Sequence, residues 1–168
     1  MAAMTFSPRL AFAIAVLAGA VALGVALGSE RFAGLVPCAL CLVERWPWRL
    51  ATGLGVLGLV LPRRFARALL GLIAAVLLVG AGEAFVHVGV EAGYWPSPLP
   101  ECEAPHLVGV SAARLLASMP ERPSKPCDEP TYLVPGLPVS MAAMNLGFAL
   151  AVASFMAISA VRRDRSVP

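Results

Sequence analysis

The chain has 168 residues, of which 59% are hydrophobic and 14% are charged, and its mean hydropathy is +0.80. A soluble domain carries roughly 25% charged residues, so this much apolar sequence exceeds the needs of one soluble core. The formal net charge of +3 is small, and the basic residues do not gather with aromatic ones, which argues against a nucleic-acid-binding surface. The composition therefore indicates a protein that lies in a lipid bilayer.

Four apolar segments follow one another along the chain, at about 10–28, 42–61, 68–90 and 139–161. Each is close to the roughly 20 residues that cross a hydrocarbon core about 30 Å thick. Because lipid offers no hydrogen-bond partner to the backbone, each is expected to be a helix. A cleaved signal peptide is the alternative for the first segment, but its apolar stretch is longer than the usual 7–15 or so residues. The sequence predicts an all-α integral membrane protein, with residues 1–168 forming one four-transmembrane-helix bundle.

Basic residues mark one side of this bundle. Lys and Arg in short loops favour the cytoplasmic side, so we expect both termini in the cytoplasm. The opposite side then receives a short loop at about 29–41 and a long loop at about 91–138. The arginines on the cytoplasmic side are Arg9, Arg63, Arg64, Arg67, Arg162, Arg163 and Arg165.

The long outer loop is rich in proline. Ten of the fifteen prolines lie between Pro96 and Pro138, and proline inside a helix removes a backbone hydrogen bond. We therefore expect a mostly irregular periplasmic loop. The stretch from His106 to Met119 lacks proline and predicts a short helix on the membrane surface, with a partly ordered loop segment as the alternative.

The first cysteine pair is Cys38 and Cys41, a C-x-x-C at the start of the second apolar segment, directly after Pro37. All four cysteines of the chain fall on the outer side, where disulfides persist. A bond across two residues closes too small a loop to add much stability. Free backbone N–H groups at a helix start favour the reactive thiolate, so the pair indicates redox chemistry. Half of a metal site and an inert structural pair are the alternatives.

The second pair, Cys102 and Cys127, lies 25 positions apart in the long loop. A disulfide here would contribute roughly 3 kcal/mol in the chain-entropy model, so a purely structural role is a serious alternative. The loop could also carry these cysteines to the first pair or to another protein, as thiol–disulfide exchange requires.

Ionisable residues also lie within the apolar segments. Arg45 and Arg49 continue the helical stripe of the C-x-x-C, and an arginine at this depth is costly and usually functional. Arg45 could stabilise a thiolate and polarise the carbonyl oxygen of an electron acceptor, or it could simply extend to the lipid headgroups. Arg49 could pair with Glu83. His87 lies four residues after Glu83. It could have a functional role, or it could be an interfacial or hydrogen-bonded core histidine.

These residues resemble a known family. Residues Pro37 to Arg45 read Pro-Cys-Ala-Leu-Cys-Leu-Val-Glu-Arg, and Tyr-Trp-Pro-Ser-Pro at 94–98 shortly precedes Cys102, with Cys127 following. The pattern is similar to that of disulfide bond formation protein B, DsbB, over the whole chain. The resemblance implies a four-helix bundle in the bacterial inner membrane. It also implies the activity of a protein-disulfide:quinone oxidoreductase.

The resemblance further implies a partner and roles for the cysteines. A DsbA-like periplasmic thiol oxidase would attack Cys102 and release Cys127. Cys127 would then attack Cys38, and Cys41 would become the thiolate that contacts the quinone.

The cofactor implied by the resemblance is a membrane quinone, ubiquinone or menaquinone. Arg45 and His87 are the residues of this chain that would lie beside it. No metal is expected.

Two other functions stay open on the residues alone. The four thiols could serve a membrane metal-binding or transport protein, because a closed zinc site needs four ligands. Alternatively, two inert disulfides could brace a structural membrane protein.

Overall fold

The computed structural model describes residues 7–102, 125–134 and 136–161. Within these residues the chain is helical and has no strand. The predicted surface helix at 106–119 and the arginines at 162, 163 and 165 lie outside the described residues. The elements are α1 (Pro8–Ala33), α2 (Ala39–Val43), α3 (Arg45–Val60), the 3-10 helix η1 (Arg63–Phe65), α4 (Ala66–Glu91), the 3-10 helix η2 (Pro100–Cys102) and α6 (Met141–Val161).

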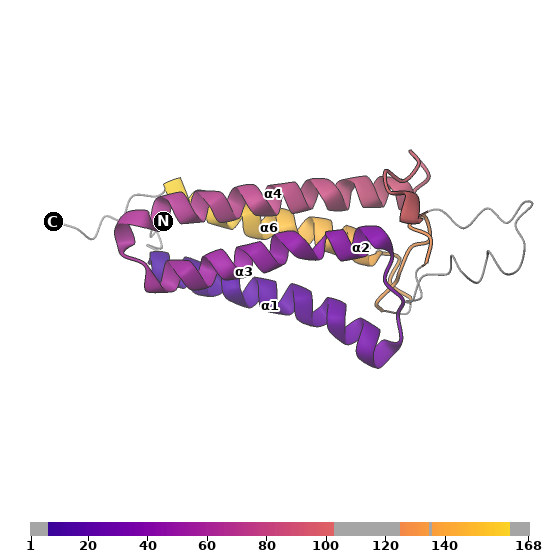
Figure 1. Cartoon of the computed structure of the whole chain (residues 1–168), viewed down its shortest axis with the longest axis horizontal. Coiled ribbons are helices and arrows are strands. Elements are labelled where there is room, and N and C mark those ends of the chain that lie inside the picture. The colour runs from indigo at the N-terminus through magenta and orange to yellow at the C-terminus, as the bar shows by residue number, and fades with distance from the viewer. Residues whose placement is uncertain (1–6, 103–124, 135, 162–168) are drawn as a thin grey trace, which may run out of the picture.

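The four long helices α1, α3, α4 and α6 form a bundle (Figure 1). Helix α4 packs along α6, and α3 packs against both α1 and α4. The start of α1, the connection from α3 to α4 and the end of α6 share one end of the bundle. Helix α2, the end of α4 and residues 125–134 share the other end, so segments far apart in the sequence meet there.

Three helices are long and apolar enough to cross a membrane: α1, η1 with α4 (Arg63–Glu91), and α6. The second predicted span, 42–61, is divided between α2 and the 16-residue α3. Pro47 gives a physical reason for the break. It has no N–H to donate to the carbonyl of Val43, and its ring crowds that carbonyl. The described residues thus contain three candidate spans, and the fourth stays a prediction.

The first helix is longer than the sequence predicted. Ser7 caps its start by accepting a hydrogen bond from the Leu10 backbone N–H at 3.3 Å. The helix continues past residue 28 to Ala33, because residues 29–33 include neither proline nor glycine. Gly34 ends it with φ 65°, a left-handed conformation that glycine adopts without strain. The predicted outer loop at 29–41 is therefore non-helical only over 34–38.

Close packing between the first half of α1 and the second half of α3 holds these two helices together. A Cβ atom at Gly55 of α3 would lie 2.9 Å from Val16 Cγ2 and 3.2 Å from the carbonyl oxygen of Phe12. The absence of a side chain at Gly55 is therefore what lets α1 and α3 approach so closely. The largest fully buried side chains besides the cysteines are Phe12, Leu70, Ile73, Leu77 and Met156.

A leucine at Gly55 should force α1 away from α3. Overpacking of this kind costs about 1–3 kcal/mol, so Gly55→Leu should lower the thermal unfolding temperature in detergent. Gly53→Leu is the matched control on the same helix, since a Cβ there meets nothing within 4 Å. Equal unfolding temperatures for the two variants would contradict this packing.

Candidate redox site

The first cysteine pair lies at the head of α2. Cys38 is the N-cap residue, and its Sγ accepts a hydrogen bond from the backbone N–H of Cys41 at 3.1 Å. Both residues are free thiols. Cys38 is 1% exposed, whereas Cys41 is partly exposed. The helix start therefore supplies a fixed N–H donor to one sulfur and leaves the other more accessible.

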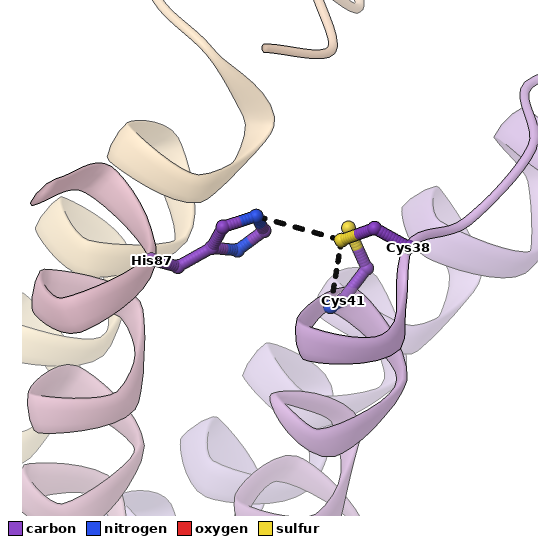
Figure 2. A group of neighbouring side chains, drawn as sticks. All are labelled: Cys38, Cys41 and His87. Atoms are coloured by element: carbon purple, nitrogen blue, oxygen red, sulfur yellow. Dashed lines mark hydrogen bonds between the residues drawn. The ribbon is translucent and has the colours of Figure 1, made fainter. Parts of the chain in front are cut away.

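His87 of α4 faces this pair (Figure 2). Its Nε2 lies 3.4 Å from Cys38 Sγ, and its Nδ1 lies 2.6 Å from Glu44 Oε1. The imidazole is buried, so water does not compete for either nitrogen. His87 is thus held between a thiol and a carboxylate, in the position of a base for Cys38.

The second cysteine pair joins the same cluster. Cys102 and Cys127 form a disulfide with a Cα–Cα distance of 5.0 Å. Both are buried and pack with Cys38, Leu40 and Val90. The disulfide and the dithiol are therefore neighbours, although they come from distant parts of the sequence.

A cavity of about 300 Å³ opens beside the first pair. Cys41 and His87 line it together with the polar side chains Glu44, Arg45 and Asn145. The rest of its wall is mostly apolar. Those apolar residues include Val21, Ala22, Val25, Leu35, Trp48, Leu133, Met144 and Phe148.

Arg45 is the cation of this cavity. One of its terminal nitrogens forms an ion pair with Glu30, near the end of α1. Its Nε is buried and has no hydrogen-bond partner among the described residues. A buried unpaired donor is costly, so an acceptor atom in the cavity would be bound there favourably.

The second arginine of the predicted stripe points elsewhere. Arg49 is exposed, and its guanidinium carbon lies 5.1 Å from the centroid of the Trp46 ring. The predicted alternative partner, Glu83, has a buried Oε2 without a hydrogen-bond partner in the part of the chain that the structure describes. Arg45 and Arg49 therefore differ in their access to the site.

Several residues of the site were not singled out from the sequence. Glu44 and Glu30 hold His87 and Arg45, as described above. Asn145 of α6 bonds to both Glu44 and Trp48. A signal for Asn145 was available, since a lone amide in the apolar segment 139–161 needs a partner inside the bundle.

The site also has donors suited to a metal ion. One ligand atom each from Cys38, Cys41 and His87 lie within 4.8 Å of one another. Thiolate and imidazole suit zinc, and a carboxylate behind the histidine is common in zinc sites. A reduced pair could therefore hold a cation, whereas a disulfide could not.

The two thiols differ in acidity. The pKa of Cys38 is lowered, chiefly because the Cys41 thiol donates a hydrogen bond to it, although burial acts in the opposite direction. The backbone N–H of Cys41 lowers the same pKa further. The pKa of Cys41 is raised by the same thiol–thiol hydrogen bond and by burial. Cys38 is therefore the sulfur that ionises first in this arrangement.

Comparison with known proteins agrees with this geometry. Residues 8–159 match the family described as "Disulfide bond formation protein DsbB". The chain belongs to the DsbB family. With three helices fit to cross a membrane, it is a membrane protein of that family.

A curated relative of this DsbB-family chain is disulfide bond formation protein B of Stutzerimonas stutzeri (strain A1501). The two are 36% identical over 105 residues, which cover 58% of this chain and 63% of the relative. The match thus spans less than two thirds of the relative's length. No solved structure matches this chain.

Removing the Cys41 side chain should make Cys38 less acidic. Cys41→Ala deletes the thiol donor but leaves the backbone N–H, so the pKa of Cys38 should rise and its thiolate should appear only at higher pH. The ultraviolet absorbance of the thiolate, followed against pH, measures this. The protein with Cys41 and the Cys41→Ala protein should both carry Cys102→Ala and Cys127→Ala, so that only thiols of the first pair titrate. A first ionisation at the same or lower pH in the Cys41→Ala protein would contradict the assignment.

Proposed function

We propose that this DsbB-family protein is a thiol:quinone oxidoreductase. It would reoxidise a DsbA-like periplasmic dithiol oxidase and pass the electrons to a membrane quinone, ubiquinone or menaquinone. The observation that carries the proposal is the cavity, whose mostly apolar wall includes Cys41 of the first pair and a buried cation, Arg45.

The residues present fit a quinone. The wall of the cavity is mostly apolar, which suits an aromatic ring with a lipid tail. The unpaired Nε of Arg45 offers a donor to a carbonyl oxygen. When bound, a quinone accepts an electron pair and a pair of protons and becomes a quinol.

The chain's own residues would prepare the dithiol for this reaction. His87 Nε2 takes the Cys38 proton, and the Cys41 N–H holds the resulting thiolate. Arg45 favours negative charge in the cavity, because a preorganised cation stabilises charge as it develops. The Cys38 and Cys41 thiols together give up two electrons and two protons and become a disulfide.

The Cys102–Cys127 disulfide would connect this chemistry to the partner. A thiolate of the partner attacks Cys102, and the partner becomes oxidised as Cys102 and Cys127 become thiols. These thiols then reduce the Cys38–Cys41 disulfide and re-form their own, so atoms and electrons balance. The packing of both pairs in one buried cluster supports a short route for this exchange.

The same proposal includes the membrane arrangement. We place the protein in the bacterial inner membrane, with four spans and both termini in the cytoplasm. Support comes from the basic residues Arg9, Arg63, Arg64 and Arg67. They belong to the first turn of α1, to η1 and to the first turn of α4, which share one end of the bundle.

Neutralising Arg45 should impair quinone reduction specifically. Arg45→Gln removes the cation from the cavity, and we expect quinone reduction to fall by about 10²-fold, the lower end of the loss seen when one preorganised donor is removed. The absorbance of a soluble quinone, with a reduced DsbA-like protein as the electron donor, measures the rate. Arg49→Gln is the control, because Arg49 lies outside the cavity wall, and it should keep nearly the parent rate. Equal losses in the two variants would refute the role of Arg45.

The two cysteine pairs should fail at different steps. Cys102→Ala with Cys127→Ala should block oxidation of the DsbA-like protein but leave quinone reduction by a small dithiol intact. Cys38→Ala should abolish both reactions, because no disulfide can form at the cavity. Quinone reduction that survives in Cys38→Ala would sink the proposal.

Metal binding is the second candidate, and the grouping of Cys38, Cys41 and His87 favours it. A site built from all four thiols does not fit this structure, since Cys102 and Cys127 are bonded to each other. The reduced protein should then bind zinc in competition with a chromophoric chelator, and His87→Ala should weaken that binding. Zinc retained through repeated quinone turnover would favour the metal function over the redox one.

A further inference from the structure

A line of hydrogen bonds runs from α3 through α6 to the Cys38 thiol. Trp48 Nε1 lies 2.8 Å from Asn145 Oδ1, and Asn145 Nδ2 lies 2.7 Å from Glu44 Oε2. Glu44 Oε1 lies 2.6 Å from His87 Nδ1, and His87 Nε2 lies 3.4 Å from Cys38 Sγ. These five side chains come from parts of the chain as distant as residues 38 and 145.

The first member of the line fixes the direction of the rest. An indole N–H only donates, so the oxygen of the Asn145 side chain must face Trp48. The amide nitrogen of Asn145 must then face Glu44 and donate to its carboxylate. Trp48 thus fixes the orientation of the Asn145 side-chain amide.

The direction continues through the carboxylate to the histidine. One carboxylate oxygen of Glu44 accepts a hydrogen bond from Asn145, and the other oxygen is hydrogen-bonded to His87 Nδ1. Imidazole in general holds a proton more tightly than a carboxylate does, so the shared proton lies on Nδ1. A neutral histidine with its proton on Nδ1 has a lone pair on Nε2, which is the nitrogen that faces Cys38.

We infer that Trp48 and Asn145 are positioning residues that act through Glu44 to hold His87 in the tautomer that can accept the Cys38 proton. In that transfer the S–H bond of Cys38 breaks and an N–H bond forms at Nε2, which leaves a thiolate and an imidazolium. Net charge does not change. The consequence for quinone reduction rests on the proposed function, whereas the tautomer itself does not.

The packing around the line supports a fixed arrangement. The Trp48 ring is buried and stacks on Phe148 of α6, with ring centroids 5.1 Å apart. His87 and Glu44 are buried as well. Reversing one member of a buried line would leave donors facing donors, and an unsatisfied buried group is costly. The line therefore favours one direction throughout.

Nitrogen-15 NMR of the histidine ring tests the inference directly. The chain has two histidines, so labelled protein with His106→Gln shows the His87 ring alone. We expect Nδ1 to carry a proton in both the oxidised and the reduced protein. A parent spectrum with the proton on Nε2 and a lone pair on Nδ1 would overturn the inference without any further variant.

Variants then test whether Asn145 and Trp48 set this tautomer. Asn145→Leu removes both hydrogen bonds of the Asn145 side chain, so the Nδ1 and Nε2 signals of His87 should shift toward the average of the two tautomers. Trp48→Phe keeps an aromatic ring beside Phe148 but loses the N–H, and it should shift the signals less in the same direction. Ser159→Ala is the control on α6, since Ser159 donates to the backbone carbonyl of Phe155 in its own helix and, among the described residues, has no bond to the line; it should leave the signals unchanged. Parent-like signals in both Asn145→Leu and Trp48→Phe would refute the positioning role.

The rate of quinone reduction completes the test. If the tautomer serves catalysis, Asn145→Leu should lower kcat by about tenfold, less than the roughly 10²–10⁴-fold of a whole acid–base contribution, because His87 itself stays in place. An unchanged kcat despite a shifted tautomer would overturn the catalytic consequence. Absence of quinone reduction in the parent would instead contradict the proposed function, so the two failures are distinguishable.

Discussion

The contact between Cys38 Sγ and His87 Nε2 is the interaction on which the rest of the site depends. It joins the head of α2 to the C-terminal part of α4 through two residues that are 49 positions apart in the sequence. Helix α2 ends at Val43 and α3 begins at Arg45, and Pro47 has no N–H to donate to the carbonyl of Val43. Glu44 then lies at the break and holds the far side of the imidazole. The thiol and the carboxylate thus flank the short helix α2, and both meet the imidazole that α4 supplies.

The surroundings of the Cys38–Cys41 pair suit a redox role better than a stabilising one. The Cys38–Cys41 pair would close too short a loop to stabilise the fold, yet it lies where its ionised form is hydrogen-bonded. The Cys102–Cys127 disulfide packs against it, and a cavity with a cation opens on its other side. The proposed function requires such a position, because the pair would receive electrons from one neighbour and give them to another. The structure supplies both neighbours without exposing Cys38 to solvent.

Some of this could be predicted from the sequence, and the physical reasons are clear. Hydrophobic length predicted α1, α4 and α6, because lipid leaves a long apolar segment no alternative to a helix. The family was predicted chiefly from a local motif, Pro37 to Arg45, whose residues are close in the chain, and the family match over residues 8–159 confirmed it. The extension of α1 to Ala33 was missed, because apolar length marks the lipid-facing part of a helix and not its true end.

The contacts between helices were beyond the reach of sequence reasoning. Nothing in the local pattern around Arg45 indicates that its partner is Glu30 of α1 or that Arg49 turns toward Trp46. Asn145 was visible as a polar residue in an apolar helix, but its bond to Glu44 depends on how α6 rotates against the bundle. Pairings of this kind are decided by tertiary packing, which periodicity and composition do not describe.

The central claim is that the Cys38–Cys41 pair gives its electrons to a quinone. It is tested most directly by mixing the fully reduced Cys102→Ala, Cys127→Ala protein with a soluble quinone in the absence of oxygen. Quinone absorbance and the remaining thiols are followed together, and mass spectrometry locates any disulfide. The account predicts one new Cys38–Cys41 disulfide for each quinone reduced. Quinone that stays oxidised beside an intact dithiol would contradict it.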